Sequence, residues 1–215
     1  FVVIDIEKLS AIRYPLSAIA EQICNRKYGV GADGLLVLDK SKIADIKMRI
    51  FNADGSEAEM CGNGARCVAL YLGKPHVKIE TKAGIIESQV NADHVKIKLT
   101  DPRDTKLDMP IKVNNRTLQV NFINTGVPHT VIFVEGLDKI DVMSLGKQIR
   151  FHKSFAPCGT NADFIEILNN NSIKIRTYER GVEDETLACG TGAVASALLT
   201  TYHLRLTTDK INVHT

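Results

Sequence analysis

The chain has 215 residues, of which 44% are hydrophobic and 24% charged, and its formal net charge at neutral pH is +2. This length suits one large domain or two small ones, and so small a net charge gives no indication of a nucleic-acid or membrane partner. No apolar run approaches the roughly 18 residues of a membrane-spanning helix, and no secretory signal pattern is present. We therefore expect a soluble, cytoplasmic protein.

Short aliphatic and β-branched runs predict a series of strands, and their frequent alternation indicates that one face of each sheet is exposed. In chain order these strands cover residues 1–4, 35–38, 47–51, 77–81, 95–99, 130–134 and 164–167. Two stretches rich in helix formers, 65–71 and 193–199, predict helices that begin just after Cys61 and Cys189. Strand-like runs at both ends of the chain indicate that it is trimmed, with a first strand missing.

Three sequence blocks recur in the same order and at nearly the same spacing. The matched pairs are residues 46–65 with 173–193, 1–5 with 131–135, and 31–35 with 159–163. Collinear repeats of this kind indicate two homologous lobes. We expect residues 1–115 to form the N-terminal lobe and residues 116–215 the C-terminal lobe, the last part of which can return to the N-terminal lobe.

The repeat singles out two of the five cysteines, because Cys61 and Cys189 occupy equivalent positions, each followed by Gly-x-Gly at a predicted helix start. The free N–H groups and the dipole of a helix start favour a bound carboxylate and lower the pKa of an adjacent thiol. Cys24, Cys67 and Cys158 lack this context and are interpreted as buried structural residues. The spacing of the five fits neither a disulfide framework nor a zinc site.

Two such thiols on opposite sides of one α-carbon can invert its configuration. A thiolate on one face removes the α-proton while the thiol on the other face donates one. The helix N–H groups stabilise the negative charge that develops on the substrate carboxylate. The pattern therefore predicts an amino-acid racemase or epimerase with its site between the lobes.

Two segments, residues 52–64 and residues 179–192, resemble the signature segments of the diaminopimelate epimerase family. Residues 124–129 resemble its Gly-x-Pro-His turn and residues 159–161 its Gly-Thr-Asn turn, so the resemblance covers nearly the whole chain. It implies an α+β fold of two lobes related by a pseudo-two-fold repeat. Each lobe is expected to be a mixed, mostly antiparallel sheet curled around a central helix, with the active site in the cleft between lobes.

The resemblance further implies interconversion of LL- and meso-diaminopimelate, in lysine and peptidoglycan precursor biosynthesis, by a homodimer that uses neither PLP nor a metal. Cys61 is implied as the proton donor and Cys189 as the acceptor in the LL to meso direction, with His129 and Glu179 assisting the thiols and holding the α-amino group. The implied ligands of the reacting carboxylate are Gly62, Asn63, Gly190 and Thr191. Those of the distal amino-acid head are Asn52, Asn161 and Arg180, the last able to bind a carboxylate bidentately.

Alternatives remain open at this stage. Proline and hydroxyproline racemases and phenazine-type isomerases share the resembled fold. Proline, however, offers no second amino-acid head for Arg180, and the phenazine-type relatives lack the cysteine pair. A non-catalytic amino-acid-binding protein would have no need of both thiols. Val127 and Gly34 stand where other members of the resembled family have polar residues.

Overall fold

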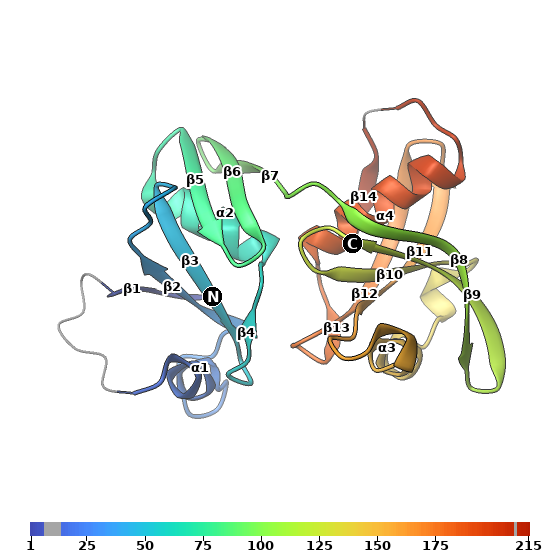
Figure 1. The fold of residues 1–215 in the computed structure, drawn as a ribbon, viewed down its shortest axis with the longest axis horizontal. Helices are drawn as coiled ribbons and strands as arrows, with labels where there is room; N and C mark the ends of the chain where they lie inside the picture. Colours follow the sequence, from blue (N-terminus) through green and yellow to red (C-terminus); the bar gives the residue numbers. More distant parts are fainter. Residues whose placement is uncertain (7–13, 209) are drawn as a thin grey trace. The chain divides into compact units, whose positions relative to one another are not determined.

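The computed structural model describes residues 1–6, 14–208 and 210–215, which form two compact units, Phe1–Thr100 and Asp101–Thr215. Figure 1 shows each unit as a sheet with helices. A boundary after residue 115, as expected from the sequence, would cut the turn of the hairpin between β8 (Arg103–Val113) and β9 (Arg116–Asn124). Since these strands pair with each other, both belong to the C-terminal unit.

In the described part of the N-terminal unit, the sheet has the order β1-β2-β3-β5-β6-β7, and the short β4 pairs with β3. β1 runs parallel to β2 and β3 parallel to β5, while the other neighbours are antiparallel. Its elements are β1 (Val2–Asp5), α1 (Leu16–Cys24), β2 (Gly34–Asp39), β3 (Ile46–Asn52), β4 (Glu57–Ala58), α2 (Gly62–Leu72), β5 (His76–Thr81), β6 (Gly84–Asn91) and β7 (His94–Lys98).

In the described part of the C-terminal unit, the sheet has the order β13-β12-β11-β10-β9-β8, and β14 pairs with β12. The sequence allowed the end of the chain to return to the N-terminal lobe, but the β12–β14 pairing keeps residues 212–214 in their own unit. After β8 and β9 its elements are β10 (Pro128–Phe133), η2 (Leu137–Lys139), α3 (Val142–Arg150), η3 (Lys153–Phe155), β11 (Asn161–Asn169), β12 (Ser172–Glu179), β13 (Asp184–Thr186), α4 (Gly190–His203) and β14 (Asn212–His214).

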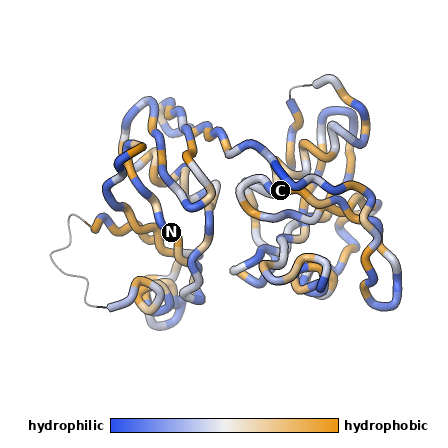
Figure 2. The backbone as a smooth tube through the Cα atoms, viewed as in Figure 1, coloured by the Kyte–Doolittle hydropathy of each residue, from blue (hydrophilic) through white to orange (hydrophobic). Residues whose placement is uncertain are grey.

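Helices cover both faces of the central strands in the N-terminal unit. On β2, Leu36 and Leu38 pack in the core that contains Val68 of α2, whereas Leu35 and Val37 pack in the core of α1. This double burial explains why β2 is a continuous apolar run, visible in Figure 2 as hydrophobic colour near the N-terminus. The expectation of one exposed sheet face is correct for β5 to β7, where burial alternates, but wrong for β2.

The C-terminal unit repeats this layering, with α3 on one face and α4 on the other. On β11, Ala162 and Phe164 pack in the α3 core and Ile165 in the α4 core, which also contains Ala195 and Leu199 of the helix. The expected two-lobed α+β architecture is thus confirmed, with an additional helix in each unit. Within the described residues, no helix is long and apolar enough to cross a membrane.

The repeat extends to topology and strand register. The series β1-α1-β2-β3-β4-α2-β5 recurs as β10-α3-β11-β12-β13-α4-β14, with the same parallel and antiparallel pairings. Leu35 lies opposite Phe51 on β3 and Ala162 opposite Tyr178 on β12, so Leu35 and Ala162 are equivalent. Their partners on the other side are Val2 on β1 and Thr130 on β10. The sequence matches of residues 1–5 with 131–135 and of 31–35 with 159–163 are therefore out of register, although both pair the correct strands.

The short strand that leads to each cysteine is held by an equivalent ion pair. Arg49 of β3 donates from Nε and Nη2 to Glu57 of β4 over 2.8 and 3.2 Å. Arg176 of β12 does the same to Glu185 of β13 over 2.6 and 2.8 Å. Such bidentate pairs fix orientation as well as distance, so both cysteine loops start from a tethered strand.

Candidate active site

In the N-terminal unit, Cys61 is the N-cap of α2. Its extended backbone (φ −140°, ψ 121°) turns into the helix, and its Sγ accepts the Gly64 N–H at 3.4 Å. The thiol thereby occupies the place of a capping side chain beside the unpaired helix donors. The side chain of Asn63 accepts a 3.3 Å hydrogen bond from Arg66. The expected cysteine, glycines and asparagine therefore meet at one helix start.

In the C-terminal unit, Cys189 is the N-cap of α4 and is buried, with an exposed fraction of 8%. Its Sγ lies 3.4 Å from Oγ1 of Thr191, the second residue of the helix. The backbone carbonyl of Thr191 accepts a 3.0 Å hydrogen bond from the Thr125 hydroxyl, which fixes the helix start against the loop before β10. The two predicted residues Gly190 and Thr191 thus lie directly beside the thiol.

A fully buried polar chain continues from Thr191 into the sheet. Thr191 Oγ1 lies 2.8 Å from Nε2 of His129, and Nδ1 of His129 lies 2.7 Å from Oδ2 of Asp163. The other oxygen of Asp163 accepts the Thr177 hydroxyl at 2.8 Å. His129 and Asp163 are both 0% exposed. The predicted site histidine is therefore linked to Cys189 through one hydroxyl group.

Strand alternation explains why these side chains meet. Asp163 shares the α4 face of β11 with Ile165, and Val131 and Thr177 are its partners on the strands on either side. His129, two residues before Val131, projects to the same face. The helix start then fits tightly, because a Cβ at Gly192 would lie 2.5 Å from Asp163 Oδ1 and 3.3 Å from His129 Cε1.

The environment of Cys189 opposes ionisation. Burial, followed by the negative charges of Glu179 and Asp163, raises the pKa of Cys189 well above its ordinary value, although hydrogen bonds from Thr191 and the Gly192 N–H lower it. The expectation that the helix start lowers the pKa of this thiol is therefore wrong, because desolvation outweighs the helix field. A base at this position needs a partner that accepts its proton.

Glu179 and the residues expected to bind the distal head lie at strand ends or in the adjoining turns, which they also stabilise. Asn161 donates to the Pro128 carbonyl at 2.9 Å and accepts the Arg180 N–H at 2.8 Å. Glu179, at the end of β12, accepts the Thr186 hydroxyl at 2.9 Å. In the N-terminal unit, Asn52 ends β3 and donates to the Ser56 hydroxyl at 3.0 Å. The C-terminal unit thus brings seven expected site residues to the region between β10, β12 and α4: His129, Asn161, Glu179, Arg180, Cys189, Gly190 and Thr191.

The remaining thiols only partly follow the sequence expectation. Cys24 is buried in the α1 core, and desolvation raises its pKa. Cys67 and Cys158 are exposed, so the interpretation of both as buried residues is wrong. Cys67 lies on α2, whose buried side is formed by Ala65, Val68 and Ala69.

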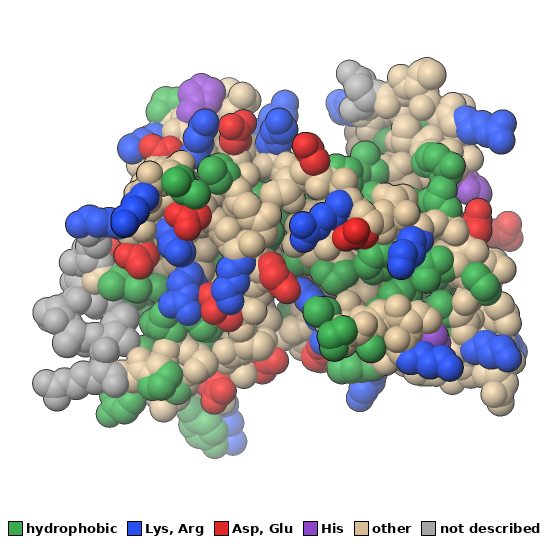
Figure 3. Space-filling model, in the orientation of Figure 1, with side chains coloured by type: hydrophobic (Ala, Val, Ile, Leu, Met, Phe, Trp, Pro, Cys, Tyr) green, Lys and Arg blue, Asp and Glu red, His purple; other side chains and the backbone are tan. Residues whose placement is uncertain are grey.

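Metal binding finds no support in the described residues, and the face seen in Figure 3 carries charges of both signs. Among residues 1–6, 14–208 and 210–215, there is no group of three His, Cys, Asp or Glu side chains that could hold a metal ion. Figure 3 shows Lys and Arg side chains interleaved with Asp and Glu on the visible face of each unit. Mixed charge of this kind creates no extended field of one sign.

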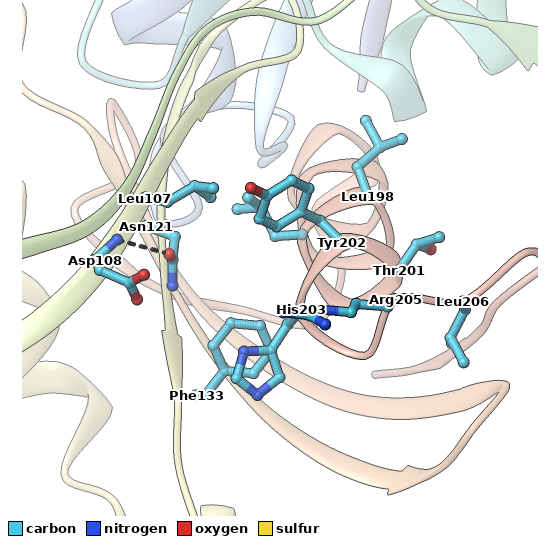
Figure 4. A pocket seen from close by; sticks show the side chains of 11 residues that line it. Leu107, Asp108, Asn121, Phe133, Leu198, Thr201, Tyr202, His203, Arg205 and Leu206 are labelled. Atoms are coloured by element: carbon cyan, nitrogen blue, oxygen red, sulfur yellow. Dashed lines mark hydrogen bonds between the residues drawn. The ribbon is translucent and has the colours of Figure 1, made fainter.

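A pocket of about 710 Å³ in the C-terminal unit is separate from the cysteine site. It lies at the C-terminal end of α4, where Leu198, Tyr202 and His203 face Leu107 and Phe133 (Figure 4). The rings of His203 and Phe133 stack with centroids 4.5 Å apart. Cys189 lies at the opposite end of the same 14-residue helix, so this pocket contributes nothing to the thiol chemistry.

Solved structures share the fold at low sequence identity. A probable proline racemase from Agrobacterium radiobacter matches with a TM-score of 0.66 and 18% identity over 88% of this chain and 65% of its own. A PhzF-family phenazine biosynthesis protein from Bacillus anthracis matches with a TM-score of 0.60 and 21% identity over 94% and 73%. The chain thus spans slightly less than two thirds of the racemase.

Sequence comparison gives the family. The family model described as diaminopimelate epimerase matches residues 1–104 and 121–215. Diaminopimelate epimerases from Caldanaerobacter subterraneus and Methanocella arvoryzae are 41% and 40% identical, over 98% and 100% of this chain and 84% and 82% of their own lengths. The matched family and relatives are epimerases, so the chain, with a cysteine at one helix start in each unit, is an isomerase of the epimerase class. Within that class, the chain belongs to the diaminopimelate epimerase family.

Sequence reasoning missed Asp163, Thr177 and Thr125, which surround the helix start in the C-terminal unit. A signal for Asp163 was available, because a carboxylate in the otherwise apolar stretch of residues 162–165 has to be paired if that stretch is a buried strand.

Proposed function

We propose that the protein interconverts LL- and meso-diaminopimelate with two thiols, Cys61 and Cys189, that act on opposite faces of the substrate α-carbon. The observation that carries this proposal is the repeated helix start, in which each thiol is an N-cap followed by Gly-x-Gly. Membership of the family supports the choice of substrate. The reaction requires that the N-terminal and C-terminal helix starts face each other across a bound substrate.

In the LL to meso direction, Cys189 removes the α-proton and Cys61 donates one from the other side. The first N–H groups of α2 and α4 bind the reacting carboxylate and stabilise its developing charge. Glu179 holds the α-amino group. His129 supports Cys189 and does not take the expected second role, because its two ring nitrogens face Asp163 and Thr191. Asn52, Asn161 and Arg180 bind the distal head, whose two charges distinguish this substrate from proline.

Membership of the family also supports the proposals of a homodimer, a cytoplasmic location and a place in lysine and peptidoglycan precursor biosynthesis. Light scattering of the purified protein at micromolar concentration tests the first of these. A mass of one chain would contradict the homodimer.

Incubation of the protein with LL-diaminopimelate tests the proposed activity, with chiral separation of the products and with proline and lysine as controls. We expect the meso isomer only from diaminopimelate. Because each half of the inversion needs its own thiol, Cys61→Ala and Cys189→Ala should each reduce the rate by at least about 10²-fold, the lower range for a positioned acid or base. Cys67→Ala should leave it unchanged. Epimerisation of proline, or full activity of either site variant, would contradict the proposal.

A further inference from the structure

Asp163 is a buried carboxylate that the proposed reaction does not use. Its side chain is 0% exposed, one oxygen lies 2.7 Å from His129 Nδ1, and the other accepts the Thr177 hydroxyl at 2.8 Å. It also lies against the first turn of α4, the end of a helix that attracts negative charge. Because the Asp163 carboxylate is enclosed and both of its oxygens have hydrogen-bond partners, its position relative to His129 Nδ1 is fixed.

The contact between Asp163 and His129 Nδ1 determines which group donates in each hydrogen bond between His129 and the Cys189 thiol. With Asp163 ionised, its carboxylate can only accept, which places the His129 proton on Nδ1. Nε2 is then the acceptor for the Thr191 hydroxyl proton, 2.8 Å away. In that arrangement the Thr191 oxygen is left to accept the proton of the Cys189 thiol, at 3.4 Å.

We propose that Asp163 is a positioning residue for Cys189: it holds His129 so that the imidazole accepts, through the Thr191 hydroxyl, the proton that the thiol releases. The thiol proton passes from Sγ to Thr191 Oγ1 while the hydroxyl proton of Thr191 passes to Nε2. A thiolate and an imidazolium result, and the Nδ1 proton stays on the imidazole, hydrogen-bonded to the Asp163 carboxylate. The use of this thiolate in epimerisation rests on the proposed function, whereas the relay itself does not.

Burial makes such an acceptor necessary. Desolvation raises the pKa of Cys189, as do the charges of Glu179 from β12 and Asp163 from β11, while Thr191 and the Gly192 N–H lower it. His129 from β10 supplies the imidazole that faces the same helix start. A nearby imidazolium offsets both the desolvation and the two negative charges.

Asp163 thus acts on the thiol in two opposite ways, which separates the proposal from simple electrostatics. As a bare negative charge it disfavours the thiolate, so its neutralisation would make Cys189 more reactive. As the partner of His129 it stabilises the imidazolium, so its neutralisation makes Cys189 less reactive. A triad carboxylate changed to its amide shows the second behaviour, because the imidazole is then held in the wrong tautomer.

The test is the alkylation rate of Cys189 by iodoacetamide in the full chain between pH 6 and 9, followed by peptide mass spectrometry, with the exposed Cys67 as internal standard. Asp163→Asn should slow alkylation of Cys189 about tenfold at pH 7.5, the change that a shift of one pKa unit produces, and should move its pH profile to higher pH. An unchanged or faster rate would overturn the proposal. Circular dichroism establishes that the variant is folded.

Thr191 provides a second test that leaves the buried charges in place. Thr191→Val should slow Cys189 alkylation to the same extent as Asp163→Asn, whereas Thr191→Ser, which keeps the hydroxyl, should keep the wild-type rate. The double variant Asp163→Asn with Thr191→Val should be no slower than either single variant. Thr200→Val is the matched control, because Thr200 is buried on the same helix and its hydroxyl has no hydrogen-bond partner among the described residues. Wild-type reactivity of Thr191→Val, or strictly additive losses, would contradict the relay.

The two proposals fail separately, because alkylation needs no substrate. If Asp163→Asn slows alkylation of Cys189 while the wild-type chain leaves diaminopimelate unchanged, the relay is supported and the proposed function is contradicted. If the wild-type chain epimerises diaminopimelate while neither Asp163→Asn nor Thr191→Val changes the alkylation rate of Cys189, the proposed function is supported and the relay is contradicted.

Discussion

At the scale of single residues, the repeat places two chemically different thiols in equivalent backbone positions. Cys61 is half-buried and accepts the Gly64 N–H, whereas Cys189 is buried and lies beside the Thr191 hydroxyl. The residue equivalent to Thr191 in the N-terminal unit is Asn63. The Cys-Gly-x-Gly motif therefore predicts the location of both thiols and the N–H of the second glycine beside each of them. Thr191 adds a hydroxyl beside Cys189, whereas the side chain of Asn63 accepts from Arg66.

Gly192 and its equivalent Gly64 give a matched comparison at this scale. An added Cβ at Gly192 would meet the Asp163 carboxylate at 2.5 Å and the His129 ring at 3.3 Å, both fixed by hydrogen bonds. At Gly64 it would meet the end of the Leu36 side chain at 2.9 Å, which can rotate. Gly192→Ala should therefore lower epimerase activity and the melting temperature more than Gly64→Ala. Equal or inverse effects would contradict the described packing around the α4 start.

The cysteines and glycines of the site were predictable because their pattern is local and repeated. The sequence signals that the Asp163 carboxylate needs a partner, but it does not identify His129 and Thr177 as the partners, because they lie on strands adjacent only in the folded sheet. Thr125 meets the α4 start only through tertiary packing. The raised pKa of Cys189 was missed for a related reason. The helix start is visible in the sequence, whereas the burial of the thiol depends on tertiary packing.

At the scale of elements, the sequence missed the strands β4, β6, β8, β9, β12 and β13 and the helices α1 and α3, although it predicted the other strands and the helices after each cysteine. In α1, residues 16, 19, 20, 23 and 24 are apolar, which is the spacing of an amphipathic helix. In α3, Asp141 caps the helix by accepting the Ser144 N–H, and Val142 and Ile149 face the core. Both helices are only nine residues long, so their periodic signal is short.

The Arg49–Glu57 pair predicts how the stability of the N-terminal unit depends on pH. Hydrogen bonding from Arg49, and then from Lys82, lowers the pKa of Glu57. Because the pKa of Glu57 is lower in the folded than in the unfolded chain, its ion pair stabilises the fold at any pH above the pKa of glutamate in the unfolded chain, about 4.3. This stabilisation is lost as the pH falls through the lower pKa of the folded state. Glu57→Gln should therefore cost about 1 kcal/mol at pH 7, since Arg49 is partly exposed. The cost should disappear at acidic pH.

Thermal unfolding at pH 7 and pH 3 measures this difference. Glu87→Gln serves as the control, because the Lys78–Glu87 pair is longer, at 3.5 Å, and more than half exposed on both sides. This control should change the melting temperature little at either pH. A Glu57→Gln deficit that grows on acidification would contradict the assigned ion pair.

At the scale of the whole molecule, duplication of one strand-helix series explains how a single chain obtains two similar helix starts. The sequence repeat predicted this duplication, since three blocks recur in order. It did not predict the division of the chain, because β8 and β9 have no counterparts in the repeated series and join the C-terminal sheet through their own hairpin. The proposed chemistry requires that the units, Phe1–Thr100 and Asp101–Thr215, each supply one thiol to the same carbon.

The central claim, one thiol on each face of the α-carbon, is tested most directly by isotope exchange in deuterated water. LL-diaminopimelate is incubated with the protein, and the α-deuterium content of both isomers is measured by mass spectrometry during the first few per cent of conversion. Two monoprotic thiols predict a meso product with deuterium at the inverted carbon and a recovered LL substrate that still carries protium. A meso product that retains the substrate proton, or an LL pool that acquires deuterium as fast as meso forms, would show that one base serves both faces.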